Sequence, residues 1–343
     1  MGKSERVGAS SPGSEAISIE REAPRAFADP PPGVARVIIV SEDGLRPDAL
    51  VAAGARVHAR LIAEGAFSAQ ARTTARASTL PGHAAMLSGF DESRHGLTWN
   101  SWKPDRGFIR VPTVFSAAAQ AGKGTAAFVG KLKLAHIVRP DRVDIFSRPH
   151  YLCRKVVEEA AAYFVSKKPA VQFVHFSDPD AEGHKNGWMS PEQLEAVRTA
   201  DGCLGTLVEA IERAGLAEET LLLVSADHGG HGMGHSGDNN EADRRIPWLA
   251  WGAGVRKGHR LVREIATMDT AATALWALGL PQPEGAAGSP VTEAFASRKA
   301  PREGRAGLIK RYGEGEPVLP VVGPGQPGEG ARGLEPQGGA RTL

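Results

Sequence analysis

The sequence is poor in cysteine, lacks long apolar runs and carries almost no net charge. Only two of its 343 residues are cysteines, Cys153 and Cys203. Two cysteines cannot build a disulfide framework, and neither has the CxxC spacing of a metal site, although one disulfide between them stays open. No segment approaches the roughly 18 consecutive apolar residues of a membrane-spanning helix. The net charge of +2, from 41 basic and 39 acidic residues, gives no reason to expect a nucleic-acid or membrane partner.

The two ends of the chain differ in composition from its middle. Residues 1–34 are rich in serine, glycine, proline and charge, and 17 of the last 43 residues are glycine or proline. Such segments cannot bury enough apolar surface to offset chain entropy, so we predict a disordered N-terminal segment (1–34) and a disordered tail (300–343). No apolar run follows the first charges. The sequence as written therefore predicts a cytoplasmic protein, or an extracytoplasmic one if the true start differs.

Short apolar runs alternate with helical patterns in residues 35–299, which we expect to form one domain. This alternation predicts an α/β fold with a mostly parallel central sheet and helices on both faces. The expected strands are 34–40, 67–73, 125–130, 170–176, 220–226 and 246–252. The expected helices are 47–64, 113–121, 151–166, 191–214 and 269–278.

An acidic residue follows each of three predicted strands. Asp43 comes after VIIV, Asp180 after VQFVHF and Asp227 after LLLVSA. In open α/β sheets, ligands bind beyond the carboxyl ends of the strands, so three strands would deliver carboxylates to one edge. A single aspartate there is as readily a helix cap or turn residue, but three at comparable positions favour a site.

Histidines and one threonine complete a set of candidate ligands at strand-end and turn positions. His184 follows Asp180 by four residues, His228 follows Asp227 directly, and His235 lies seven residues further on. Carboxylates and imidazoles in this mixture suit two divalent ions held close together. Thr79, in STLPGH, is a candidate nucleophile beside them.

Five segments together resemble one known family. They are VSEDGLRPDAL, STLPGHAAMLSGFDESRHGL, DPDAEGH, VSADHGG, and GHSGDN followed by IPWLAWGAGV. In this order, over about residues 35–255, they resemble the type I phosphodiesterase/nucleotide pyrophosphatase branch of the alkaline phosphatase superfamily. The resemblance implies an alkaline phosphatase-like three-layer sandwich as the catalytic domain (35–299).

The resemblance also implies two metal sites. One would use Asp180, His184 and His235, and the other Asp43, Asp227, His228 and the Thr79 oxygen. Zinc suits these ligands, and manganese or iron would also fit. His231 competes with His235, which we prefer because Gly-Asp-Asn follows it, and Asp178 is a rival of Asp180.

The implied chemistry is attack by Thr79 on phosphorus, a covalent phospho-threonine and its hydrolysis. Thr79 precedes a predicted helix, whose first N–H groups would face the phosphoryl group; a simple N-cap role is the alternative. Asn100, in HGLTWNSW, matches the asparagine that contacts a non-bridging phosphate oxygen in the family, and a turn role is the alternative.

We therefore expect a hydrolase of small-molecule phosphate esters, most simply a phosphodiesterase or nucleotide pyrophosphatase. A phosphomonoesterase on the same core is an alternative, and a non-catalytic metal-dependent binding module is another. The sequence contains no cysteine or serine in the C/S-x-P-x-R setting of sulfatases, and it does not predict an oligomeric state.

Several residues near these motifs are expected to have mainly structural roles. Trp99 and Trp102 would form either a wall of the substrate site or part of the core. Lys131 and Lys133 follow a strand end and are expected to be a solvated pair, with contact to the substrate as the alternative. His175 is expected to be a satisfied core histidine. His83 and His95 are expected to be structural.

Overall fold

The structure is a computed structural model that describes residues 29–235 and 240–296. In this part of the chain, eight strands form one sheet in the order β4-β3-β5-β1-β6-β7-β2-β8. Only β7 runs antiparallel to its neighbours, β6 and β2. The predicted mostly parallel sheet is therefore confirmed. The strands are β1 (Arg36–Glu42), β2 (Ala66–Arg72), β3 (Thr125–Val129), β4 (Ile145–Ser147), β5 (Val171–Phe176), β6 (Thr220–Ser225), β7 (Arg245–Gly252) and β8 (His259–Arg260).

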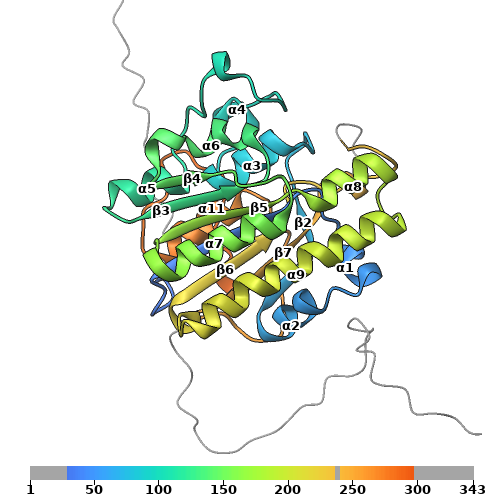
Figure 1. The fold of residues 1–343 in the computed structure, drawn as a ribbon. Helices are drawn as coiled ribbons and strands as arrows, with labels where there is room; N and C mark the ends of the chain where they lie inside the picture. The colour runs from blue at the N-terminus through green and yellow to red at the C-terminus, as the bar shows by residue number, and fades with distance from the viewer. Residues whose placement is uncertain (1–28, 236–239, 297–343) are drawn as a thin grey trace, which may run out of the picture. The chain divides into compact units, whose positions relative to one another are not determined.

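Helices cover both faces of this sheet (Figure 1). Side chains alternate along β1: Ile38 and Val40 pack with residues of α7 and α9, while Val37 and Ile39 pack with residues of α3, α5 and α11. Because both faces are buried, the strand is apolar throughout instead of alternating with polar residues. The helices are α1 (Pro47–Ala53), α2 (Arg56–Glu64), α3 (Thr79–Ser88), α4 (Glu92–His95), α5 (Val114–Gln120), α6 (Ala135–Val138), α7 (Cys153–Lys167), α8 (Asp178–Asn186), α9 (Pro191–Arg213), α10 (Glu241–Arg244) and α11 (Asp269–Ala277).

The predicted helix 47–64 is in fact two helices. Gly54 adopts φ +63°, a left-handed conformation, and its N–H donates to the carbonyls of Leu50 and Val51. This glycine ends α1, and α2 begins at Arg56. The apolar stripe continues through both helices, which is why periodicity alone merged them.

Several short elements were not predicted, among them β4, β8 and α8. Strands β4 and β8 have three and two residues, too few for a recognisable alternation. Helix α8 directly follows β5, so Asp180 and His184 lie on a helix and not in a turn as expected.

The predicted terminal segments lie largely outside the described residues, which exclude 1–28 and 297–343. Among the described helices, none combines the length and apolar character needed to cross a membrane.

Candidate metal centre

Three adjacent parallel strands bring the predicted acidic residues to one edge of the sheet. Strand β1 pairs in parallel with β5 on one side and with β6 on the other. Asp43 follows β1 directly, Asp180 lies in the first turn of α8 after β5, and Asp227 follows β6. The carboxyl ends of the three strands thus hold three buried carboxylates.

A first group of potential ligands consists of Asp180, His184 and His235. Asp180 and His184 are four residues apart on α8, so their side chains lie on the same face of the helix. The Nε2 atom of His184 is 3.4 Å from Asp180 Oδ1 and 3.1 Å from the Nε2 atom of His235. These are the three residues expected for one metal site.

A second group consists of Asp43, Asp180 and His228. Nε2 of His228 lies 3.4 Å from Asp43 Oδ1 and 3.8 Å from Asp180 Oδ1. Asp227 Oδ2 is 3.3 Å from the same nitrogen. The structure therefore places Asp180 in both groups, whereas the sequence assigned it to one site only.

The orphaned atoms of these groups fit a bound cation. Asp43 Oδ1, Asp180 Oδ1, Asp227 Oδ2 and His228 Nε2 are buried and have no hydrogen-bond partner among the described residues. Leaving four polar atoms unpaired at one point would be costly unless another group satisfies them. Carboxylate oxygens and imidazole nitrogens are ligands that divalent zinc accepts.

Each histidine of the two groups is oriented by its other nitrogen. Nδ1 donates to a backbone carbonyl in all three cases: His184 to Met233 (3.1 Å), His228 to Gly229 (2.7 Å) and His235 to Ala77 (2.7 Å). A carbonyl only accepts, so the ring proton is on Nδ1 and the lone pair of the neutral ring is on Nε2. Such bonds are typical of histidines that bind metals.

The electrostatics favour ionised carboxylates in the centre, and the hydrogen bond to Asp180 raises the pKa of His184. Burial would raise the pKa of Asp43, but the Lys131 ammonium and a hydrogen bond with His175 hold this pKa well below its usual range. Burial and the Asp43 charge also oppose ionisation of Asp180, yet Lys131 and His184 lower its pKa. Burial lowers the pKa of His235 to about 4.

Lys131 is not the solvated residue that the sequence predicted. It is buried, and its Nζ lies 2.7 Å from Asp43 Oδ2 and 2.5 Å from Asp180 Oδ2. Burial would lower the pKa of Lys131, but the two carboxylates outweigh it and raise the pKa, so the group is an ammonium. Both lysines follow the end of a strand, which indicated that they lie near the site. Only the structure shows that Lys131, and not Lys133, contacts the carboxylates. Lys133 is the more accessible one, and its Nζ donates to Asn100 Oδ1 (3.0 Å).

Two buried histidines support the carboxylates. His175 is satisfied, as predicted, but its partner is Asp43: Nε2 lies 2.8 Å from Asp43 Oδ2, and Nδ1 accepts from the Gly130 N–H (3.3 Å). His83 Nδ1 donates to the Thr79 carbonyl (2.8 Å) and lies 3.2 Å from Asp227 Oδ2. From the sequence, both histidines were expected to have structural roles only. Their contacts with the acidic residues were not predicted.

Thr79 is the first residue of α3 and is buried. Ser78 occupies the N-cap position, so the alternative in which Thr79 is only an N-cap is wrong. Helix α3 packs closely against the segment after β6, because a Cβ on Gly82 would come within 2.4 Å of the Asp227 carbonyl oxygen. The start of the helix is therefore anchored beside Asp227.

Asn100 lies at the start of the same helix. Its Oδ1 accepts a hydrogen bond of 3.0 Å from the backbone N–H of Leu80, the residue after Thr79. With Oδ1 held by Leu80 and Lys133, the amide nitrogen is directed away from them. The structure thus brings Asn100 to Thr79, although 20 residues separate them in sequence.

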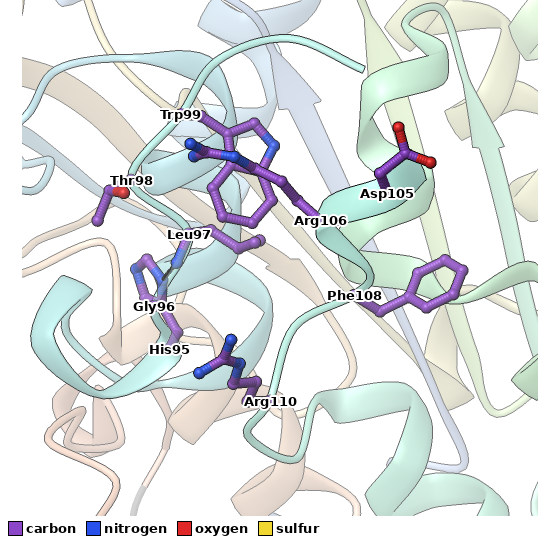
Figure 2. A pocket seen from close by; sticks show the side chains of 9 residues that line it. All are labelled: His95, Gly96, Leu97, Thr98, Trp99, Asp105, Arg106, Phe108 and Arg110. Carbon is purple, nitrogen blue, oxygen red and sulfur yellow. Dashed lines mark hydrogen bonds between the residues drawn. The ribbon is translucent and has the colours of Figure 1, made fainter. Parts of the chain in front are cut away.

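A cavity of about 400 Å³ opens beside the segment that carries Asn100 (Figure 2). Trp99 lines it and packs against the core, with the Arg106 guanidinium 5.0 Å from its ring centre. Arg110 and His95 lie on the other side of the cavity. Trp102 is exposed and does not line the cavity. The two tryptophans therefore have different roles.

The rival ligands are directed elsewhere. Asp178 accepts from the Cys153 N–H (2.8 Å), and burial raises the pKa of Asp178 to about 6. His231 is half-exposed, and its Nδ1 lies 2.6 Å from Asp243 Oδ1. Neither belongs to a ligand group, whereas Asp180 and His235 do. The Gly-Asp-Asn context used to choose His235 lies outside the described residues.

Sequence reasoning missed Trp188. Its ring centre lies 5.1 Å from that of His184 and 5.8 Å from that of His235, and its Nε1 donates to the Gly44 carbonyl (2.8 Å). A Cβ on Gly230 would come within 2.1 Å of the indole, so glycine is required for this approach. The pairing of one tryptophan with distant glycines leaves no signal in a single sequence.

Comparisons with known proteins place these features in a family. The model for type I phosphodiesterase/nucleotide pyrophosphatase matches residues 37–246. GPI ethanolamine phosphate transferase 1 of Gibberella zeae is 24% identical over 287 residues, which cover 71% of this chain and 28% of the transferase. Bis(5'-adenosyl)-triphosphatase ENPP4 of Bos taurus is 27% identical over 225 residues, which cover 59% of this chain and 48% of that protein.

A solved structure shares the fold. Murine ectonucleotide pyrophosphatase/phosphodiesterase 5, in an inactive threonine-to-alanine form with AMP, superposes with a TM-score of 0.64 at 17% identity, over 76% of this chain and all of that one. The chain spans less than half the length of the two curated relatives above. The family match nevertheless covers more than half of this chain and contains all the predicted metal ligands. The chain belongs to the type I phosphodiesterase/nucleotide pyrophosphatase family.

Proposed function

We propose that this protein is a metal-dependent phosphodiesterase that uses Thr79 as its nucleophile. The observation that carries the proposal is the convergence of four unpaired buried ligand atoms, from Asp43, Asp180, Asp227 and His228, at the sheet edge against which the start of α3 is packed. The two ligand groups would hold divalent ions, most simply zinc, with manganese or iron as alternatives.

The chain's own residues account for the transfer step. Thr79 Oγ would form a bond to phosphorus as the bond to the leaving alcohol breaks, giving a phospho-threonine that water then hydrolyses. Bound divalent ions would favour the alkoxide of Thr79 and neutralise charge on the phosphoryl oxygens. Thr79 is the first residue of α3, where the helix dipole favours negative charge. The Asn100 amide would donate to a non-bridging oxygen.

The family match favours a diester over a monoester. The cavity lined by Trp99, Arg106 and Arg110 contains none of the proposed metal ligands in its lining, so the preference does not rest on it. A phosphomonoesterase remains the alternative on the same core, because the ligand groups serve either reaction.

Transfer to an alcohol is a second candidate function. The match to GPI ethanolamine phosphate transferase 1 covers 71% of this chain. A phospho-threonine could react with an alcohol in place of water, so hydrolase and transferase differ only in the acceptor. A non-catalytic binding module is the weaker alternative, because both the ligand set and Thr79 are present.

The disulfide bears on location. Cys153 and Cys203 are bonded in the structure and link α7 to α9. Disulfides persist mainly in oxidising compartments, so this bond favours the extracytoplasmic alternative over the cytoplasmic one expected from the sequence as written. We propose a small-molecule phosphate ester as the substrate, with no nucleic-acid or membrane partner.

The test is a comparison of chromogenic esters with the zinc-loaded protein. We expect bis(p-nitrophenyl) phosphate to be hydrolysed at least tenfold faster than p-nitrophenyl phosphate. Faster monoester turnover would favour the phosphomonoesterase, and absence of turnover with metals bound would favour the binding module. Adding ethanolamine or glycerol and analysing the products would show whether an alcohol competes with water as acceptor.

A further inference from the structure

Unpaired hydrogen-bond donors also gather outside the metal centre, in the cavity beside the segment that carries Asn100. His95 and Trp99 both line this cavity. His95 Nε2 and Trp99 Nε1 are buried, and neither atom has a hydrogen-bond partner among the described residues. Buried polar groups without a partner are unfavourable and rare in folded proteins. The two atoms therefore require a partner that the described part of the chain does not supply.

Both unpaired atoms are donors. His95 Nδ1 accepts a hydrogen bond of 3.1 Å from the backbone N–H of Leu97, so the ring proton is on Nε2. Burial lowers the pKa of His95 to about 4, so the ring is neutral at neutral pH and keeps this tautomer. The indole nitrogen of Trp99 can only donate. The missing partner must therefore be an acceptor.

Two guanidinium groups add positive charge to the same cavity. Arg106 and Arg110 line it and are exposed, and neither side chain forms an ion pair or hydrogen bond with the described residues. The Arg106 guanidinium is positioned by the Trp99 ring, 5.0 Å from its centre, and not by a carboxylate. Asp105, the acidic residue of the lining, directs its carboxylate away from Arg106 (Figure 2). Both guanidinium groups can therefore bind an external oxyanion.

We propose that this cavity is a second anion-binding site, which takes a phosphate group that is not held at the metal centre. The guanidinium groups of Arg106 and Arg110 would balance its charge, and the N–H groups of His95 and Trp99 would donate to its oxygens. A phosphate group has at least three terminal oxygens that point in different directions, whereas a carboxylate has two in one plane. Donors on different sides of a cavity therefore favour phosphate.

This site is distinct from the proposed metal centre and does not depend on the proposed function. The lining of the cavity contains no residue of the two ligand groups, and neither Thr79 nor Asn100. The phosphate could be free inorganic phosphate or part of a larger ligand, since the four donors would recognise the same oxygens in both.

Indole N–H signals allow the two sites to be observed separately. The chain has six tryptophans, and the full chain, purified with zinc and labelled with ¹⁵N-tryptophan, gives one NMR signal for each indole. Trp99 reports on the cavity. Trp188 reports on the metal centre, because its ring centre lies 5.1 Å from that of His184. Trp99→Phe and Trp188→Phe assign the two signals.

Inorganic phosphate, titrated at constant ionic strength, should shift the Trp99 signal until the site is saturated. Arg106→Gln and Arg110→Gln should each weaken this binding at least about tenfold, because each removes a charged donor. Both positions are exposed, so the variants should fold, and an unchanged Trp188 signal before titration checks this. Lys103→Gln is the matched control, since Lys103 is exposed on the same loop but does not line the cavity. It should bind phosphate like the wild type.

Methylphosphonate and acetate identify the ligand. Methylphosphonate has no ester bond to hydrolyse and stands for a phosphate group carried by a larger molecule. Binding as tight as that of phosphate would assign the site to such ligands, and much weaker binding would assign it to free phosphate. Acetate should bind at least about tenfold more weakly than phosphate. A Trp99 signal that does not move, that moves equally with chloride, or that moves equally in both arginine variants would overturn the proposal.

Hydrolysis of bis(p-nitrophenyl) phosphate by the same samples separates this site from the proposed function. A saturable Trp99 shift without turnover of any ester would support the anion site and reject the hydrolase. Turnover, with phosphate shifting only the Trp188 signal, would support the hydrolase and reject the anion site.

Discussion

His175 Nε2 lies 2.8 Å from Asp43 Oδ2, and both side chains are completely buried. Because His175 Nδ1 accepts from the Gly130 N–H, its Nε2 carries the proton and donates to the carboxylate. Burial lowers the pKa of His175 to about 4, so the ring is a neutral donor across the physiological range. This bond orients Asp43 so that Oδ1 faces His228.

His175→Phe keeps a ring of similar size but removes the donor to Asp43. Loss of such a supporting hydrogen bond typically weakens a metal site by 10- to 100-fold, so we expect about this loss of zinc affinity in the second group. Competition titration measures it. His95→Phe is the matched control, because His95 is equally buried but outside both ligand groups. Equal effects of the two substitutions would show that only packing is involved.

Thr79→Ala should abolish ester hydrolysis, with a loss of at least about a thousandfold, because it removes the attacking oxygen. Thr79→Ser should keep measurable turnover, and a phosphorylated residue 79 should be trapped by acid quenching and found by mass spectrometry. Thr74→Ala, in the segment before α3, is the control. Full activity of Thr79→Ala would mean that another group attacks phosphorus.

Trp188→Phe should weaken zinc binding by the first group about tenfold, because the indole supports His184 and His235 and is fixed by its bond to the Gly44 carbonyl. Zinc affinity and melting temperature should be measured together. Trp102→Phe serves for comparison, since Trp102 is exposed. A change in melting temperature with unaltered affinity would limit Trp188 to a packing role.

The Cys153–Cys203 bond closes a loop with a sequence separation of 50 residues. A disulfide that closes a loop of this size lowers the conformational entropy of the unfolded chain, which stabilises the folded state by about 4 kcal/mol. We expect Cys203→Ala to lower the midpoint of urea denaturation, and reduction of the wild type to have the same effect. Thiol labelling of the unfolded wild type should detect no free cysteine. Two free thiols in protein made under oxidising conditions would contradict the pairing.

A buried cluster of His58, Asp201 and Glu42 makes stability depend on pH, and burial raises the pKa of Glu42 to about 7. His58 Nδ1 lies 2.8 Å from Asp201 Oδ1, and Nε2 lies 3.4 Å from Glu42 Oε1. Burial would lower the pKa of His58, but the Glu42 charge and the Asp201 hydrogen bond raise it above 6.5. A raised pKa in the folded state gives stability that is fully present below pH 6.5 and is lost as the pH rises through the folded value.

His58→Gln should therefore reduce the stability of the folded protein most at low pH. Removing one partner of a buried pair costs about 3 kcal/mol, so we expect a drop of roughly 10 °C in melting temperature at pH 6 and a smaller one at pH 9. Thermal unfolding followed by circular dichroism checks this. His150→Gln, at an exposed position, should show no such trend. A larger loss at pH 9 than at pH 6 would contradict the sign of the pKa shift.

The sequence by itself determined the sheet and the position of the acidic residues on it. Short β-branched apolar runs such as VIIV and LLLVSA, bounded by polar turns, indicate strands buried on both faces, and parallel strands place the residues that follow them at one edge. Asp43, Asp180 and Asp227 were therefore predictable as neighbours. The helix break at Gly54 and the short strands β4 and β8 were not, because local periodicity does not register a single left-handed residue or strands of two or three residues.

Only the tertiary structure decided how the ligands are shared and charged. Asp180 stands in both groups because α8 begins directly after β5 and directs this side chain between His228 and His184. Lys131 is buried against Asp43 and Asp180 because β3 ends next to β5, a relation between segments far apart in sequence. Burial, orientation and the pairing of charges depend on what packs around a side chain, and a residue's neighbours in sequence do not specify this.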